Sequence, residues 1–298
     1  MLPARRTASL TILAVGLALT SAAGTTASAA RPVPSHTPVT VSRSFHELER
    51  EYDARLGVWA LDTGSGRNVS WRSGERFAYA STYKALAAGA VLRQESADQL
   101  DQVVTYSKGD LVSYSPVTSE HVDTGMTLGE LCDAAVRYSD NTAGNLLLRQ
   151  LGGPAGLDRE LARLGDRTTH VDRYEPELNS AVPGDVRDTT SPRALGNDVE
   201  KYALGDVLPK SRREVLDQWL RESTTGGTLI RAGVPENWTV GDKSGAGDYG
   251  TRNDVAVVWR PDRAPLVLVV MSSRRTQDAS YDDALVAKAA GVAVESLR

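Results

Sequence analysis

The sequence predicts an α/β fold of the α+β type: an antiparallel sheet flanked by N- and C-terminal helices, with an inserted all-helical domain. Strand-like segments lie only towards the two ends, at residues 56–61 and 68–71 and again at 238–243, 254–259 and 266–271. Between them, most periodic segments are helical, and further helical patterns precede the first strand and follow the last. The strands from both ends can therefore pair into one sheet covered by the terminal helices. The clearest helical patterns cover residues 83–94, 127–138, 142–151, 157–164, 212–221 and 281–297.

Charge and cysteine content exclude several classes of protein. The 298 residues carry a formal net charge of −4, and such a mildly acidic chain lacks the basic surface that nucleic acid or an anionic membrane would attract. Cys132 is the one cysteine, which excludes an internal disulfide and a multi-cysteine metal site. Its helical, apolar surroundings in the sequence indicate a buried, inert thiol. Four scattered histidines do not suggest a metal cluster.

Residues 1–29 have the features of a secretory signal peptide. Arg5 and Arg6 form a positive start, residues 10–19 are apolar, and Ala27-Ser28-Ala29 fits a cleavage site. The apolar run is too short to span a bilayer. We expect a secreted protein without stable membrane association, extracellular or, if the source has an outer membrane, periplasmic. An uncleaved N-terminal anchor and twin-arginine export remain alternatives.

The rest of the chain divides into a leader and two domains. A Pro-, Ser- and Thr-rich leader is expected to be disordered, and a helix then begins at Ser44, which forms a capping-box pattern with Glu47. Residues 173–188 have no periodicity, and loops of this length are usually functional or disordered. The expected organisation is a signal peptide at 1–29, the leader at 30–42, a sheet-containing domain at 43–79 and 222–298, and a helical domain at 80–221 that includes the loop at 173–188.

Ser81 and Lys84 are spaced for nucleophilic catalysis. Side chains three residues apart share one face of a helix, so the hydroxyl and the amine can meet. A serine is a weak nucleophile until a base takes its proton, and a lysine can be that base where burial or nearby positive charge lowers its pKa. Taken alone, the spacing equally fits an exposed serine and lysine in a first helical turn.

Two more motifs offer groups that could bind a substrate. In Ser139-Asp140-Asn141, the hydroxyl can relay a proton and the asparagine offers a donor and an acceptor to an amide, although the motif alone also fits a helix N-cap. Lys243-Ser244-Gly245-Ala246-Gly247 ends a predicted strand. It offers a cation and a hydroxyl to a carboxylate, and its small residues would let a ligand approach the backbone, although a glycine turn would look the same.

These three motifs, in this order, form a signature of class A β-lactamases and penicillin-binding proteins. From about Ser44 to the C terminus the chain resembles a class A serine β-lactamase, and in particular the secreted actinobacterial members. The segment from Arg173 to Asn179 is similar to the start of the omega loop of that class. There, Glu175 matches the deacylating glutamate, and Arg173 and Asp188 match the ion pair that closes the loop.

The resemblance implies a monomer that hydrolyses the β-lactam amide of penicillins and early cephalosporins through a serine acyl-enzyme, giving antibiotic resistance without a metal or cofactor. Whether Lys84 or Glu175 takes the first proton stays open. Backbone N–H groups of Ser81 and Ala246 would form the oxyanion hole, and Ala88 stands where some members place a disulfide partner for Cys132. The implied site comprises catalytic Ser81, Lys84, Ser139, Glu175 and Asn179, and substrate-binding Tyr114, Asn141, Lys243, Ser244, Gly245, Ala246 and Arg252.

Two other functions fit the same fold. One is a penicillin-interactive DD-peptidase or a slow penicillin-binding protein, which generally lacks the glutamate that Glu175 matches. The other is a non-catalytic exported binding protein, which would have no need of the full set of catalytic residues. Measured turnover of a β-lactam distinguishes all three.

Overall fold

The computed structural model describes residues 1, 2, 4 and 37–298. Most of the predicted signal peptide and residues 30–36 of the predicted leader lie outside the described residues. No helix in the described part of the chain is long and apolar enough to cross a membrane.

A five-stranded sheet in the order β2-β1-β9-β8-β7 organises the fold, and every neighbouring pair is antiparallel. The prediction that strands from both ends of the chain share one sheet is confirmed, because β1 pairs with β9 from Arg55↔Ser273 to Asp62↔Leu266. The strands are β1 (Arg55–Asp62), β2 (Asn68–Trp71), β7 (Thr239–Gly247), β8 (Thr251–Trp259) and β9 (Leu266–Ser273). Two small sheets pair β3 (Phe77–Ala78) with β6 (Thr189–Thr190) and β4 (Val103–Val104) with β5 (Met126–Thr127).

The central strand β9 separates two hydrophobic cores. Its side chains alternate between the faces of the sheet, as the two-residue period of a strand requires. Leu266, Leu268 and Val270 join the core beneath the terminal helices α1 (Val39–Glu51) and α10 (Asp283–Leu297). Val267, Val269 and Met271 join the core of the helical region on the other face. Both sides of β9 are therefore buried, which accounts for its continuous apolar sequence.

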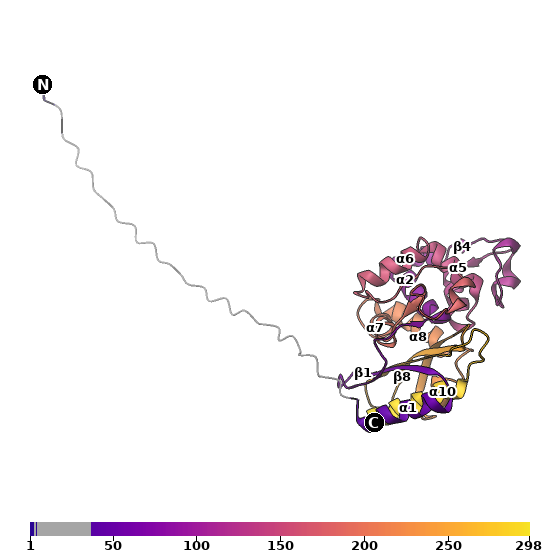
Figure 1. The fold of residues 1–298 in the computed structure, drawn as a ribbon. Coiled ribbons are helices and arrows are strands. Elements are labelled where there is room, and N and C mark those ends of the chain that lie inside the picture. Colours follow the sequence, from indigo (N-terminus) through magenta and orange to yellow (C-terminus); the bar gives the residue numbers. More distant parts are fainter. Residues whose placement is uncertain (3, 5–36) are drawn as a thin grey trace. The chain divides into compact units, whose positions relative to one another are not determined.

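The helical region covers the face of the sheet opposite α1 and α10 (Figure 1). Apart from the start of the first helix, every helical pattern predicted from the sequence is confirmed, to within three residues at each end. Helix α7 was not among them, although Ser191 caps it and Pro192 opens it, and it packs directly on β1, β8 and β9. The helices are α2 (Tyr83–Gln94), α3 (Ala97–Leu100), α4 (Leu128–Arg137), α5 (Asn141–Gln150), α6 (Pro154–Arg163), α7 (Pro192–Ala203), α8 (Lys210–Arg221) and α9 (Ile230–Gly233), with 3₁₀ turns η1 (Ala80–Thr82), η2 (Lys108–Asp110), η3 (Thr118–His121) and η4 (Glu177–Ser180).

The predicted start of the first helix is wrong. Helix α1 begins at Val39, so residues 39–42 of the predicted leader are helical, and Ser44 is not the N-cap. Ser44 lies inside the helix, where its hydroxyl donates to the carbonyl oxygen of Thr40. Val41 packs against the core beneath α1, and this tertiary contact extends the helix beyond the local capping signal.

Cys132 is buried in α4, as the sequence predicts. Burial raises the pKa of its thiol, with a smaller contribution from the neighbouring Asp133 carboxylate. A thiol that is buried and protonated is a poor nucleophile, so Cys132 serves packing rather than chemistry.

Candidate active site

Ser81 and Lys84 meet at the junction of η1 and α2. The ammonium Nζ of Lys84 lies 2.9 Å from Ser81 Oγ, and both side chains are buried. Gly245 of β7 makes this packing possible: a Cβ there would lie 2.9 Å from the carbonyl oxygen of Tyr79 and 3.2 Å from the nitrogen of Ser81. The small residue predicted to admit a ligand thus also admits the backbone that carries Ser81.

Lys84 is fully buried and held by four oxygens. Besides Ser81, its Nζ donates to the carbonyl oxygen of Ser139 at 2.8 Å and to Asn141 Oδ1 at 2.5 Å, and it pairs with Glu175 Oε1 at 3.0 Å. Burial lowers the pKa of Lys84, and the nearby Glu175 carboxylate opposes that change. The predicted depression of the lysine pKa therefore arises from desolvation.

The Ser139-Asp140-Asn141 motif begins a helix and also contacts Lys84. Asp140 caps α5 by accepting from the nitrogen of Ala143 at 2.8 Å, and this cap directs its two neighbours towards Lys84. Ser139 has a left-handed backbone conformation, with φ of 60°. Asn141 also donates from Nδ2 to the carbonyl oxygen of Ser113 at 2.8 Å, so one N–H of its amide remains for a ligand.

The Lys-Ser-Gly motif lies on the edge strand β7, which contributes side chains from both faces. Lys243 is buried on the helical side, where its Nζ donates to Ser139 Oγ at 3.0 Å. Ser244 lies on the other face, and its hydroxyl shares a 2.7 Å hydrogen bond with Thr225. Burial and the charge of Lys84 lower the pKa of Lys243 to about 7.

The loop at 173–188 brings Glu175 to the nucleophile. Ser81 Oγ donates to Glu175 Oε1 at 3.3 Å, and Asn179 Nδ2 donates to the other oxygen of the same carboxylate. Asn179 Oδ1 is buried and accepts no hydrogen bond from the described residues. The side-chain amide of Asn145 forms two hydrogen bonds with the backbone of Glu175. Its Oδ1 accepts from the backbone nitrogen of Glu175 at 2.8 Å, and its Nδ2 donates to the carbonyl oxygen of Glu175 at 3.0 Å.

The two ends of this loop are tied together as predicted. Arg173 Nε donates to Asp188 Oδ2, and the fully buried Asp188 also accepts from the backbone nitrogens of Asp172 and Arg173. The hydroxyl of Tyr79 donates to Asp188 at 2.9 Å, which connects the loop closure to the residues just before Ser81. The Glu175–Pro176 peptide bond is cis.

Arg252 and Tyr114 lie at the edges of the site. Arg252 is paired with Ala246 across β8 and β7, and Asp283 of α10 holds its guanidinium through Nε at 2.7 Å. Its Nη1 has no hydrogen-bond partner among the described residues and faces none of the described carboxylates. The Tyr114 side chain is exposed, while its carbonyl oxygen accepts from the nitrogen of Asn141 at 2.9 Å.

Comparison with known proteins identifies the family. A model of the β-lactamase enzyme family matches residues 40–297. The chain belongs to this family. It is 60% identical over 268 residues to a β-lactamase of Amycolatopsis lactamdurans, covering 89% of each chain, and 56% identical over 257 residues to one of Bacillus amyloliquefaciens, covering 86% of this chain and 84% of that one. A solved class A β-lactamase from Clostridium kluyveri matches with a TM-score of 0.86 and 48% identity over 87% of this chain and 99% of its own, which supports class A membership.

In this β-lactamase, the structure gathers the predicted catalytic side chains and adds residues that the sequence reasoning missed. Asn145 follows Asn141 by four residues on α5, so the helical spacing could have indicated it. Thr225 and Asp283 carry no such signal, because each meets its partner only through the fold.

Proposed function

We propose that this enzyme hydrolyses the amide bond of penicillins and early cephalosporins through an acyl-enzyme on Ser81, and so confers antibiotic resistance. The observation that carries the proposal is the position of Ser81 Oγ, 2.9 Å from Lys84 Nζ and 3.3 Å from Glu175 Oε1. A hydroxyl between a buried amine and a buried carboxylate has two short routes for its proton. Both halves of a serine hydrolysis are thereby provided at one place.

In acylation, Ser81 Oγ attacks the carbonyl carbon of the strained ring, and the C–N bond breaks. The Ser81 proton passes to Glu175, or to Lys84 when that amine is neutral. Backbone N–H groups of Ser81 and Ala246 stabilise the developing oxyanion. Ser139 delivers a proton to the departing nitrogen, and Lys243, which donates to its hydroxyl, keeps that group oriented.

Substrate binding uses the edge of the sheet. Ser244, Arg252 and the remaining donor of Lys243 bind the substrate carboxylate, because charged donors form strong hydrogen bonds to it. The free N–H of Asn141 and the backbone of Gly245 and Ala246 bind the substrate amide. Tyr114, exposed at the mouth, contacts the apolar part of the substrate.

In deacylation, Glu175 removes a proton from a water that attacks the ester. Asn179 supports this role, since its Nδ2 holds the Glu175 carboxylate and its buried Oδ1 is free to accept a hydrogen bond from that water. The water then replaces Ser81 on the carbonyl carbon, and the proton returns to Ser81 Oγ.

The same proposal covers the setting of the enzyme. It acts as a secreted monomer without cofactor or stable membrane association, exported by the signal segment at 1–29. Its site lies where the sheet-containing part (43–79 and 222–298) meets the helical part (80–221), because β7 packs against η1 and its Lys243 donates to Ser139 there.

Glu175→Ala tests the proposed mechanism. Attack by Ser81 remains possible through Lys84, whereas no base activates the hydrolytic water, so turnover should fall by about 10²- to 10⁴-fold. Intact-mass spectrometry after mixing with a penicillin should find the protein heavier by one whole substrate. Ser81→Ala should abolish this adduct, and the native enzyme should hydrolyse a chromogenic cephalosporin with many turnovers. A native protein that keeps the adduct for hours is a penicillin-binding protein instead, and normal turnover by Glu175→Ala would remove Glu175 from the mechanism.

A further inference from the structure

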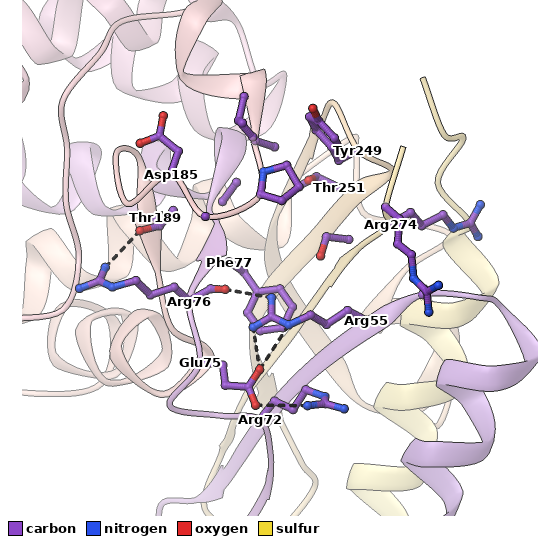
Figure 2. Close-up of a pocket in the computed structure, with 18 of the residues that line it drawn as sticks. Arg55, Arg72, Glu75, Arg76, Phe77, Asp185, Thr189, Tyr249, Thr251 and Arg274 are labelled. Carbon is purple, nitrogen blue, oxygen red and sulfur yellow. Dashed lines mark hydrogen bonds and ion pairs between the residues drawn. The ribbon is translucent and has the colours of Figure 1, made fainter. Parts of the chain in front are cut away.

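A second cleft lies behind the omega loop, away from Ser81. Its volume is about 940 Å³, within the range of sites that hold small organic ligands. Figure 2 shows Arg55, Arg72, Glu75 and Arg76 along one side, Asp185 and Tyr249 across from them, and Arg274 at one end. None of the proposed catalytic or substrate-binding residues lines it.

The cleft is basic although the chain is acidic. Seven arginines and four carboxylates line it, an excess of three positive charges in a protein of net charge −4. The carboxylates of Glu49, Glu75 and Asp185 are already paired with arginines. Four of the arginines form no ion pair with any carboxylate of the described residues, and residues 3 and 5–36, outside the description, contain no Asp or Glu. These four are Arg50, Arg76, Arg274 and Arg275.

The guanidinium groups of Arg55 and Arg274 are fixed by contacts with the surrounding protein. Arg55 stacks on the ring of Phe77 at 3.8 Å and donates to the carbonyl oxygen of Arg76 at 3.0 Å. Arg274 donates to the carbonyl oxygen of Ser280. Arg55 is also paired with Glu75, whereas the partner of Arg274 is a neutral carbonyl that leaves its charge uncancelled. The cleft therefore presents ordered cationic forks of the kind that bind carboxylate or phosphate.

One wall of the cleft is the omega loop itself. Residues 181–187 line it, and Val182 and Val186 are exposed there. Arg76 donates to Thr168 O and to Thr189 Oγ1, on either side of the loop, at 2.6 and 3.1 Å. A ligand bound between the arginines and residues 181–187 would bridge the sheet and the loop that carries Glu175.

We propose that this cleft is a second binding site, for a small anion with two or more phosphate or carboxylate groups, and that its occupancy orders the back of the omega loop. Arg76, Arg274 and Arg275 supply the charge that no carboxylate neutralises. A multivalent anion is favoured because it can engage arginines from both ends of the cleft at once.

The test uses the full mature enzyme at constant ionic strength, with pyrophosphate and citrate as separate probes. Calorimetry should detect saturable binding of at least one probe, and which binds more tightly distinguishes phosphate from carboxylate. The double variant Arg274→Ala, Arg275→Ala should weaken binding by about tenfold or more. A loss of this size corresponds to the removal of one hydrogen bond between charged groups. The matched control is Arg43→Ala, Arg159→Ala, which removes two exposed arginines elsewhere and should leave binding unchanged.

Amide hydrogen exchange tests whether the anion binds next to the omega loop. Each binding probe should slow exchange of the amides of residues 181–187 in the native enzyme and not in the Arg274→Ala, Arg275→Ala variant. Three results would overturn the proposal: no saturable binding of either probe, equal weakening in both double variants, or unchanged exchange at 181–187. Because these readouts do not measure hydrolysis, their failure would leave the proposed function untouched.

Discussion

At the scale of single residues, Ser139 joins two buried cations. Its carbonyl oxygen accepts from Lys84 and its hydroxyl accepts from Lys243. Burying an unpaired charge is costly, and the two lysines meet that cost differently. Lys84 pairs with Glu175, whereas Lys243 forms no ion pair with the described residues and has its pKa lowered to about 7.

The low pKa of Lys243 predicts the pH dependence of substrate binding. As the pH rises through about 7 the cation is lost, so KM for a carboxylate-bearing substrate should rise while kcat changes less. Lys243→Arg keeps the positive charge, so in this variant the rise in KM should occur at a higher pH. For stability the sign is the opposite: between about 7 and the ordinary lysine value of 10.5 the unfolded chain binds more protons, so stability should rise with pH. Unchanged pH profiles in the arginine variant would contradict this assignment.

Arg252 offers a second residue-scale prediction. Asp283 holds its Nε and one Nη, and the other Nη is free for a substrate carboxylate. Arg252→Ala should lower kcat/KM by about 10- to 150-fold, equivalent to roughly 1.5–3 kcal/mol for a charged hydrogen bond. The loss should be larger for a penicillin than for its ester, as paired kinetic measurements can establish. An equal loss for both would make Arg252 a packing residue.

At the scale of elements, the omega loop depends on a few polar anchors rather than on regular structure. Its one regular element is the short turn η4, and Leu178 is its buried apolar anchor. Asn145 clamps Glu175 from α5, and Asp188 collects hydrogen bonds from the opposite end of the loop and from Tyr79. The Glu175 carboxylate is therefore positioned by the elements around the loop.

Arg173→Ala should loosen this loop. It leaves the fully buried carboxylate of Asp188 without its cation, which is costly in a site of low dielectric. We expect faster proteolysis of the loop, slower hydrolysis of small penicillins and relatively better turnover of bulky substrates. Arg187→Ala is the matched control, since it removes an exposed arginine from the same loop. Unchanged proteolysis together with an unchanged order of substrates would count against the role of the ion pair.

At the scale of the whole molecule, a pair of carboxyl groups makes the stability of the fold depend on pH. Asp198 of α7 is buried beside Asp166, whose oxygens accept from the backbone nitrogens of Thr168 and Thr169. Burial, then repulsion from Asp166, raises the pKa of Asp198 to about 8, and Lys201 at 3.5 Å offsets only part of this. Asp198 is therefore protonated in the folded protein at neutral pH.

This pair predicts how stability varies with pH. Between the ordinary aspartate value of 3.8 and about 8 the folded state binds the extra proton, so the contribution of Asp198 to stability falls as the pH rises. Asp198→Asn mimics the protonated form and should be more stable than the native enzyme, by about 1–3 kcal/mol near pH 8 and by little near pH 4. Asp278→Asn, at an exposed position, is the control and should follow the native curve. Denaturation at a series of pH values measures both, and a constant difference between Asp198→Asn and the native enzyme would disprove the prediction.

Local patterns were enough to predict the order and type of the main elements. The continuous apolar run of β9 and the helical periods of α4 and α5 each lie within one segment of the sequence, and the structure has a strand and two helices there. The ordered motifs likewise predicted the groups that meet around Ser81. The start of α1 was misplaced because packing of Val41 outweighed the capping pattern at Ser44. Helix α7 was missed although Ser191 and Pro192 marked its start.

The order of residues along the chain fixes which chemical groups the enzyme possesses and how they follow one another. Folding sets the protonation state of these groups and the contacts that hold them in place. Ser81 and Glu175 are 94 positions apart, and their 3.3 Å contact depends on the loop closure at Asp188. The lowered pKa of Lys243 and the hydrogen bond from Arg252 to Asp283 also exist only in the folded chain. Burial and long-range contact set these properties, and neither quantity is local to a stretch of sequence.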